Sequence, residues 1–178
     1  TLHPTKLPDG SSFFGLAAPS RAEWRARNGG ATGSSCMFPF HIDPEIKKHL
    51  IEAGEEETDH LVWCKKRLDE LEGRSSILNP IWYAGSFAIG AVFGNFGEKV
   101  SLGFVEETEK QVVAHIDKHL DKISPKDKET IEILKTMRED EDLHAQQAVD
   151  NGGEELKIPT KKIMSATAKV MTSTSAYI

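Results

Sequence analysis

The sequence is poor in cysteine and in net positive charge, and both shortages narrow the class of protein. Only two cysteines, Cys36 and Cys64, occur among 178 residues, and they form no Cys-x-x-Cys pair. This excludes a disulfide framework and fits a reducing compartment. The formal net charge of -6 argues against nucleic-acid binding, which requires a basic face. The first residues lack the basic and then apolar pattern of a secretory signal, so we expect none.

One stretch lacks charge altogether. Residues 75–97 contain no Asp, Glu, Lys or Arg, and residues 77–96 are largely apolar. A membrane-spanning helix needs about 20 consecutive apolar residues. The run here is interrupted by polar and helix-breaking residues, namely Asn79, Pro80, Gly85, Gly90, Gly94 and Asn95. We therefore expect this segment to be buried or to rest on a membrane surface rather than to cross a bilayer.

The chain divides into two parts. Residues 1–42 are rich in Gly, Ser and Pro without periodicity, so we expect an irregular or diverged N-terminal segment. Residues 43–178 carry apolar residues at helical spacing, with start signals at Asp43-Pro44 and at Ser124-Pro125. The expected helices are 44–71, one from 80 that breaks at about 94–97, 98–122, 125–150 and 163–178. This pattern predicts an all-α, up-and-down helical bundle.

Two of these helices carry a Glu-x-x-His motif on their apolar face. Glu57 and His60 continue the apolar stripe of the first helix, and Glu141 and His144 continue that of the fourth. Glu109 takes an equivalent position on the helix between them. A buried ionised carboxylate is strongly destabilising without a partner, and a pair of metal ions is the common partner of converging Glu and His side chains. We predict that these five residues bind metal.

Neighbouring polar residues have simpler interpretations. A single Glu-x-x-His motif is typical of a solvated helix face, and only the pairing of two phased motifs favours metal binding. Glu106 is an alternative to Glu109, and His115 is either an outer partner that orients a carboxylate or a core histidine. Cys64 fits a small buried hydrophobe. Several charged or polar residues beside the motifs are expected to face solvent: Glu55, Glu56, Asp59, His119, Asp140 and Asp142.

Several motifs agree in order and spacing with one known family. Residues 78–90 read Leu-Asn-Pro-Ile-Trp-Tyr-Ala-Gly-Ser-Phe-Ala-Ile-Gly, and residues 55–61 read Glu-Glu-Glu-Thr-Asp-His-Leu. Glu109, His115 and the Glu-Asp-Leu-His of residues 141–144 follow in register. Over residues 41–178 the chain resembles the demethoxyubiquinone hydroxylases of ubiquinone biosynthesis, bacterial type.

This resemblance implies a ferritin-like fold with a centre of two iron ions. It implies an iron-dependent monooxygenase that uses dioxygen to hydroxylate a polyprenylated demethoxy-benzoquinol. It also implies peripheral attachment at the cytoplasmic face of the membrane and contact with other ubiquinone-biosynthesis proteins. The apolar segment 77–96 would then serve the lipid-tailed substrate.

The chain departs from the family at the first metal helix. The family carries there an Arg-x-x-His-Ala-Gly-Glu motif whose Glu is a ligand, and this motif is absent from the sequence. Glu23 is the only Glu before Glu45 and has no supporting motif, so we name no first-helix ligand. Two alternatives to a hydroxylase therefore stay open. One is a metal-binding or storage bundle of ferritin type, and the other is a non-catalytic quinone- or lipid-binding scaffold with an incomplete metal site.

Overall fold

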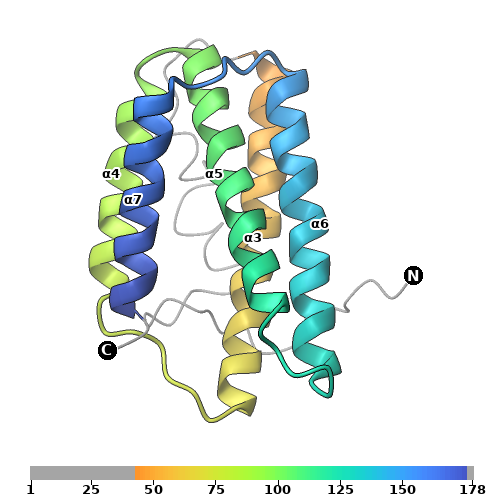
Figure 1. Ribbon diagram of the computed structural model, residues 1–178. Helices are drawn as coiled ribbons and strands as arrows, with labels where there is room; N and C mark the ends of the chain where they lie inside the picture. Colours follow the sequence, from red (N-terminus) through yellow and green to blue (C-terminus); the bar gives the residue numbers. More distant parts are fainter. Residues whose placement is uncertain (1–42, 176–178) are drawn as a thin grey trace, which may run out of the picture.

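The computed structural model describes residues 43–175, which form α-helices and, within that range, no β-strand. The helices are α3 (Pro44–Glu70), α4 (Asn79–Gly94), α5 (Glu98–Leu120), α6 (Lys128–Asp150) and α7 (Ile158–Ser175). They run up and down, with α5 in the middle, α4 and α7 to one side and α3 and α6 to the other (Figure 1). The predicted all-α bundle is confirmed. The N-terminal segment of residues 1–42 lies outside the described residues.

The start of α3 follows from its capping residues. The Asp43 carboxylate accepts a hydrogen bond from the backbone N–H of Glu45 at 2.8 Å, and Pro44 takes the first helical position, where no N–H is needed. The backbone N–H of Asp43 donates to the Glu98 carboxylate at 3.1 Å, which ties this cap to the start of α5. The helix ends as expected, and the N–H of Gly73 donates to the carbonyl of Leu68 at 2.8 Å.

Two helices begin elsewhere than the sequence predicts. Helix α6 starts at Lys128 rather than at Pro125, because Asp127 is the residue that caps it, accepting from the backbone N–H of Thr130 at 3.1 Å. Helix α7 starts at Ile158 rather than at Ile163. Its first turn contains Pro159, which is tolerated there, but it lacks the apolar spacing on which the prediction depended.

The contact between α5 and α6 is the most extensive in the bundle. The buried apolar side chains of these two helices are Leu102 and Ile116 on α5 and Ala145 and Ala148 on α6. Short alanine side chains allow the two backbones to lie close together. Helix α3 joins this pair through α6, so one side of the bundle consists of α3 and α6 together with the central α5.

A glycine lies where the two sides of the bundle meet. The connection from α6 to α7 crosses α5, and the backbone N–H of Glu154 donates to the carbonyl of Lys99 at 2.9 Å. A Cβ placed on Gly103 would lie 1.9 Å from the carbonyl oxygen of Glu154. Only a residue without a Cβ fits this crossing.

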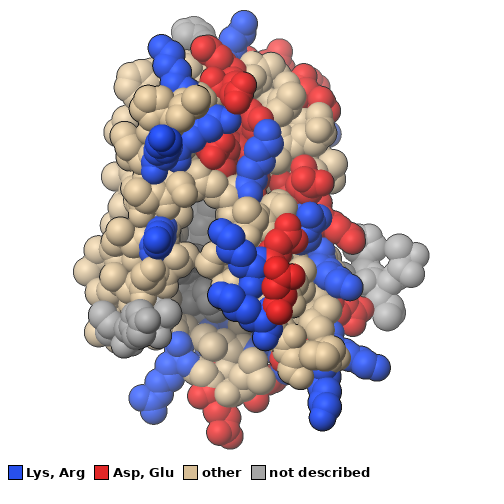
Figure 2. All heavy atoms as spheres, in the orientation of Figure 1, with Lys and Arg blue, Asp and Glu red and all other residues tan. Residues whose placement is uncertain are grey.

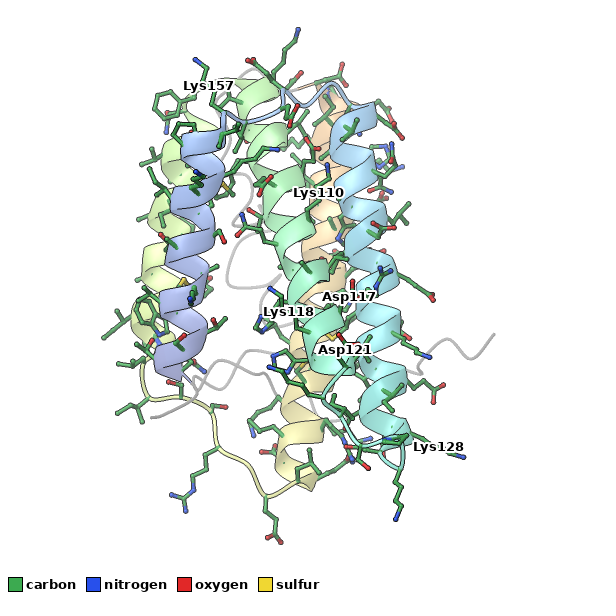
Figure 3. All side chains as sticks on the ribbon, in the orientation of Figure 1. Lys110, Asp117, Lys118, Asp121, Lys128 and Lys157 are labelled. Atoms are coloured by element: carbon green, nitrogen blue, oxygen red, sulfur yellow. The ribbon has the colours of Figure 1, made fainter. Side chains whose placement is uncertain are left out.

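Charged side chains link the helices around their outer faces. Arg67 near the end of α3 donates to Asp127, the cap of α6, at 2.9 Å, and to the Thr130 hydroxyl at 2.8 Å. Arg138 of α6 donates to Asp117 of α5 at 2.6 Å, and Figure 3 shows Asp117 beside α6. These contacts hold α3, α5 and α6 in a defined register.

Helix α4 presents its apolar side chains outward. Ile81 is 62% exposed and Phe87 is 44% exposed, and Tyr83, Ile89 and Val92 are exposed as well. The edge of the molecule formed by α4 is accordingly free of charged groups in Figure 2. The alternative that this segment is buried is therefore wrong. Within residues 43–175, no helix has both the length and the apolar character needed to cross a bilayer.

Candidate metal centre

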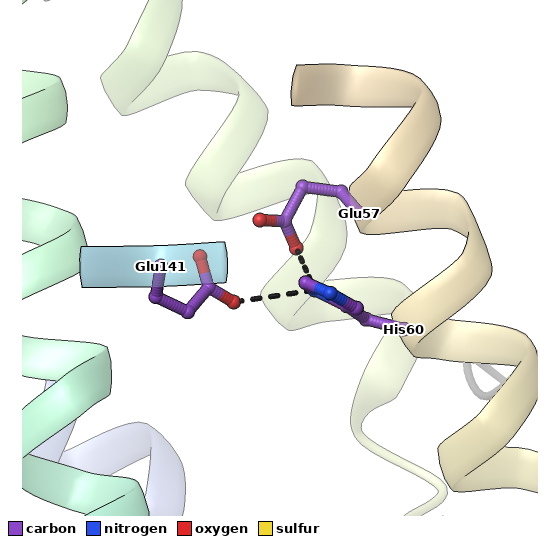
Figure 4. A group of neighbouring side chains, drawn as sticks. All are labelled: Glu57, His60 and Glu141. Carbon is purple, nitrogen blue, oxygen red and sulfur yellow. Dashed lines mark ion pairs between the residues drawn. The ribbon is translucent and has the colours of Figure 1, made fainter. Parts of the chain in front are cut away.

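The two Glu-x-x-His motifs meet between α3 and α6. A spacing of three residues places Glu57 and His60 on one face of α3, and the same spacing places Glu141 and His144 on one face of α6. His60 and Glu141 are each 2% exposed and His144 is 5% exposed. Figure 4 shows Glu57 and Glu141 directed at the His60 ring from opposite helices. These four residues come together in the structure, as the sequence predicts.

Each carboxylate faces both histidines. The two oxygens of Glu141 lie 3.4 Å from Nδ1 of His60 and 3.6 Å from Nδ1 of His144. The two oxygens of Glu57 lie 3.7 Å from Nδ1 of His60 and 3.8 Å from Nδ1 of His144. Two carboxylates therefore each span the same pair of ring nitrogens.

Helix α5 adds Glu109 to the cluster. Burial, and then the charges of Glu141 and Glu57, raise the pKa of Glu109 well above its ordinary value, and Glu109 also shares a hydrogen bond with Glu141. Glu106, the alternative ligand, is buried, but its carboxylate accepts a hydrogen bond from Lys110 at 2.5 Å. The structure thus brings Glu109 close to Glu141, Glu57 and His60, and it pairs Glu106 with a lysine.

Burial and the close approach of charged groups shift the pKa values of the cluster. Burial opposes a charge on His60, but the nearby carboxylates of Glu141, Glu57 and Asp140 outweigh it and raise the pKa of His60 to about 10. Burial raises the pKa of Glu57. Burial also opposes the charge of Glu141, yet the nearby rings of His144 and His60 hold its pKa well below its usual range. Without metal, the cluster shares protons among its carboxylates and rings.

Two buried atoms at the centre lack hydrogen-bond partners among the described residues. They are Nδ1 of His60 and one carboxylate oxygen, Oε2, of Glu141. Buried polar atoms without partners are rare, because each costs free energy comparable to a lost hydrogen bond. Both atoms are ordinary metal ligands, and Glu57, His60 and Glu141 can present ligand atoms within 4.8 Å of one another. The residues present therefore fit a bound metal ion.

Two outer carboxylates were not expected at this site. Asp140 and Glu56 were predicted to face solvent. The Nε2–H of His60 instead donates to Asp140 at 3.0 Å, and the Nε2–H of His144 donates to Glu56 at 2.7 Å. Glu56 is exposed, as expected, but its carboxylate still reaches a buried ring. The sequence contains a pattern that could have indicated these outer carboxylates, because an acidic residue directly precedes the Glu of both motifs.

His115 lies outside the cluster. It is exposed, and its ring contacts that of His119, with 4.5 Å between the ring centroids. Neither interpretation of His115, as an outer partner or as a core residue, matches this position. The reason is helical phase, because Ile116 lies two turns after Glu109 and is buried, whereas His115 is rotated by about 100° from it.

Cys64 is partly buried, rather than fully buried as the sequence predicts. Its thiol lies 3.6 Å from the sulfur of Met137, between α3 and α6. Burial, and then the charge of Glu57, raises the pKa of Cys64 to about 11, so the thiol stays neutral beside the acidic cluster. Residues 21–42, where a first-helix ligand is expected, lie outside the described residues.

Comparison with known proteins places the chain in a family. The profile of the family described as ubiquinone biosynthesis protein COQ7 matches residues 33–175. The chain is 53% identical over 133 residues to a 3-demethoxyubiquinol 3-hydroxylase of Legionella pneumophila (strain Lens), covering 75% of this chain and 62% of the relative. It is 51% identical over 138 residues to the protein of the same name from Ralstonia pickettii (strain 12J), covering 78% and 63%.

The match spans less than two thirds of the length of these relatives. No solved structure matches the chain. The helices and the buried Glu and His cluster agree with the ferritin-like bundle of the matched family. From the profile match and the identity to these relatives, the chain belongs to the COQ7 family of ubiquinone biosynthesis proteins.

Proposed function

We propose that the chain is an iron-dependent monooxygenase that hydroxylates a polyprenylated demethoxy-benzoquinol, the reaction named for its relatives from Legionella and Ralstonia. The observation that carries the proposal is the pair of carboxylates, half-exposed Glu57 and buried Glu141, that each face both histidine Nδ1 atoms. This arrangement supports two metal ions rather than one.

Five residues would hold the two irons: Glu57, His60, Glu109, Glu141 and His144. When bound, the irons supply the activation of dioxygen. In the overall reaction one oxygen atom enters the ring C–H bond, and the other leaves as water with two electrons from a reductant and two protons. The chain's own residues would hold the metal and neutralise its charge, and the burial of His60, Glu141 and His144 limits the access of water to them.

We further propose that α4 rests on a membrane surface, on the cytoplasmic side, where a lipid-tailed substrate is found. Support comes from the exposed apolar side chains of α4 and from the absence of charge over residues 75–97. Exposed apolar surface of this kind marks an interaction site, and aromatic residues such as Tyr83 favour the lipid interface.

The first experiment measures metal content. The chain is reconstituted anaerobically with ferrous iron, and free metal is removed before elemental analysis. We expect close to two irons per chain. A protein that retains no iron, manganese or zinc would refute the metal site and leave the non-catalytic scaffold as the better description.

The second experiment measures the reaction. The iron-loaded chain is mixed with reduced demethoxyubiquinone in vesicles, a reductant and isotopically labelled dioxygen. We expect one labelled oxygen atom in the hydroxylated ring, detected by mass spectrometry. Binding of two irons without ring hydroxylation would favour a ferritin-type storage bundle instead.

A further inference from the structure

The two histidines of the cluster are each held by a carboxylate from the opposite helix. Nε2 of His60 on α3 lies 3.0 Å from Asp140 on α6, and Nε2 of His144 on α6 lies 2.7 Å from Glu56 on α3. In both motifs the outer carboxylate immediately precedes the inner Glu, at positions 56 and 57 and at positions 140 and 141. The contacts therefore cross between the helices twice, with the same geometry in each direction.

We propose that Glu56 and Asp140 are positioning residues that orient His144 and His60 for metal binding. The inference rests on the proposed metal site and adds to it the residues that prepare its nitrogen ligands. A carboxylate can only accept at Nε2, so a ring that gives up one proton to bind metal keeps the other at Nε2 and offers the lone pair of Nδ1. The Nδ1 atoms are the ones that face Glu57 and Glu141.

Burial explains why such a contact matters at an exposed residue. The Glu56 side chain is 53% exposed, and an ordinary ion pair at that exposure contributes little to stability. The His144 side chain that it holds is only 4% exposed, however, so the donor belongs to a ring that is almost entirely buried. Removal of the carboxylate leaves a buried donor unpaired and the ring free to turn about its bond to the backbone.

The crossed contacts also align α3 with α6. Helix α3 makes its main helix contact in the described part of the chain with α6, and both crossed hydrogen bonds lie at the level of the metal cluster. A shift of one helix along the other would break both bonds and separate Glu57 from Glu141. We infer that the outer carboxylates set the ligand geometry as well as the ring orientation.

The experiment compares four single variants. Glu56→Ala and Asp140→Ala remove the outer carboxylates. Glu52→Ala removes a carboxylate of the same exposure one turn earlier on α3, and Glu139→Ala removes the exposed neighbour of Asp140. Zinc affinity is measured for each by competition with a chelator. We expect the first two to bind zinc about 10- to 100-fold more weakly than wild type, and the two controls to bind it equally well.

A second readout is independent of affinity. In the zinc-loaded protein, a histidine Nε2–H that is held by a carboxylate exchanges slowly and gives a downfield proton resonance. We expect two such resonances in wild type. Glu56→Ala should remove the one from His144 and keep the other, and Asp140→Ala should do the reverse. If an alanine variant fails to fold, Glu56→Gln or Asp140→Asn provides the test, because the amide oxygen restores an acceptor and should rescue the resonance.

The outcomes separate the two hypotheses. A wild type that binds no zinc overturns both the metal site and the role of its outer residues. A wild type that binds zinc, together with Glu56 and Asp140 variants that keep wild-type affinity and both resonances, overturns the positioning role alone. If the Glu52 and Glu139 variants also bind zinc more weakly, the loss of affinity comes from the change in overall charge. That result would likewise overturn the positioning role.

Discussion

On α3 and α6 the two most deeply buried residues, His60 and Glu141, are polar, whereas on α4 many exposed side chains are apolar, including Ile81 and Phe87. Soluble proteins usually bury apolar side chains and expose charged ones. Neither departure benefits the isolated chain, because buried charge needs compensation and exposed apolar surface favours association. The proposed metal would compensate the buried charge on one side, and the proposed lipid surface would cover the apolar side chains on the other.

The difference between the two sides also shows in their connections. The α3, α5 and α6 side is fixed by ion pairs such as Arg138 to Asp117 and by close helix packing. Helix α4 joins α5 through aromatic contacts near its end, where Phe93 stacks on Phe104 with 4.2 Å between ring centroids. A site that must hold ligands in fixed positions needs the first kind of support. A surface that meets a fluid bilayer does not.

The largest expected effect is the loss of metal from the cluster between α3 and α6 when a histidine ligand is removed. His60→Ala and His144→Ala each remove a buried nitrogen ligand, so we expect each to retain less than half of the wild-type iron. Iron at 100 times its dissociation constant stabilises a folded protein by about 2.7 kcal/mol, and this gain should largely disappear in both variants. Metal analysis and thermal unfolding with and without iron provide the measurement.

A matched control lies on the same helix. His49 is exposed on α3, and His49→Ala should keep both the iron and its thermal stabilisation. Normal iron content in the His60 and His144 variants would show that the Glu-x-x-His residues are not the ligands.

The second prediction concerns the exposed apolar side chains of α4. Replacing Ile81 and Phe87 together by Asp removes two apolar side chains, each worth about 1.5–3 kcal/mol on full burial. We expect binding to neutral phosphatidylcholine vesicles to weaken by at least roughly tenfold, while iron content stays unchanged. Sedimentation with vesicles measures the first and elemental analysis the second.

The control pair places the same charges on the metal-binding side. Leu71 and Val149 are exposed apolar residues at the ends of α3 and α6, and their replacement by Asp should leave vesicle binding unchanged. Equal loss in both double variants would mean that added charge, rather than the α4 surface, controls the association. Equal sedimentation of wild type and the α4 variant would refute the membrane placement.

The third prediction tests the crossing that joins the two sides. Gly103→Ala would place a Cβ 1.9 Å from the Glu154 carbonyl, so the backbone must move, and we expect a loss of about 1–3 kcal/mol in the free energy of unfolding. Gly54→Ala, on α3 with open space around it, should instead stabilise by up to about 1 kcal/mol. Urea unfolding compares them. If both changes stabilise, the crossing is not a tight contact.

Local signals predicted the helices and most of the cluster. Asp43 marks the start of α3 because capping depends on neighbours in the chain, and the phase of Glu57, His60 and Glu141 depends only on helical geometry. The start of α7 was missed because its first turn lacks apolar spacing.

Such local signals do not predict which side chains meet between two helices. Whether Glu56 reaches His144 depends on the rotation and register of α3 against α6, which residues distant in sequence determine together. The same limit applies to Glu106, whose partner is Lys110 rather than the cluster. Spacing along one helix identifies the face of a residue, but not the atom that it meets.

The smallest expected effect is a release of protons when metal binds, and it should come from one side only. At neutral pH the metal-free His60 is protonated, since its pKa is about 10, and burial favours a proton on Glu109. Metal requires neutral His and ionised Glu, so binding should release roughly one to two protons and apparent affinity should rise with pH. Zinc titration of a weakly buffered solution with a pH indicator measures the release. Glu109→Gln should release fewer protons, because one source is gone, whereas Glu52→Gln should match wild type. Zinc binding that releases no protons at neutral pH would show that the metal-free cluster is already fully deprotonated.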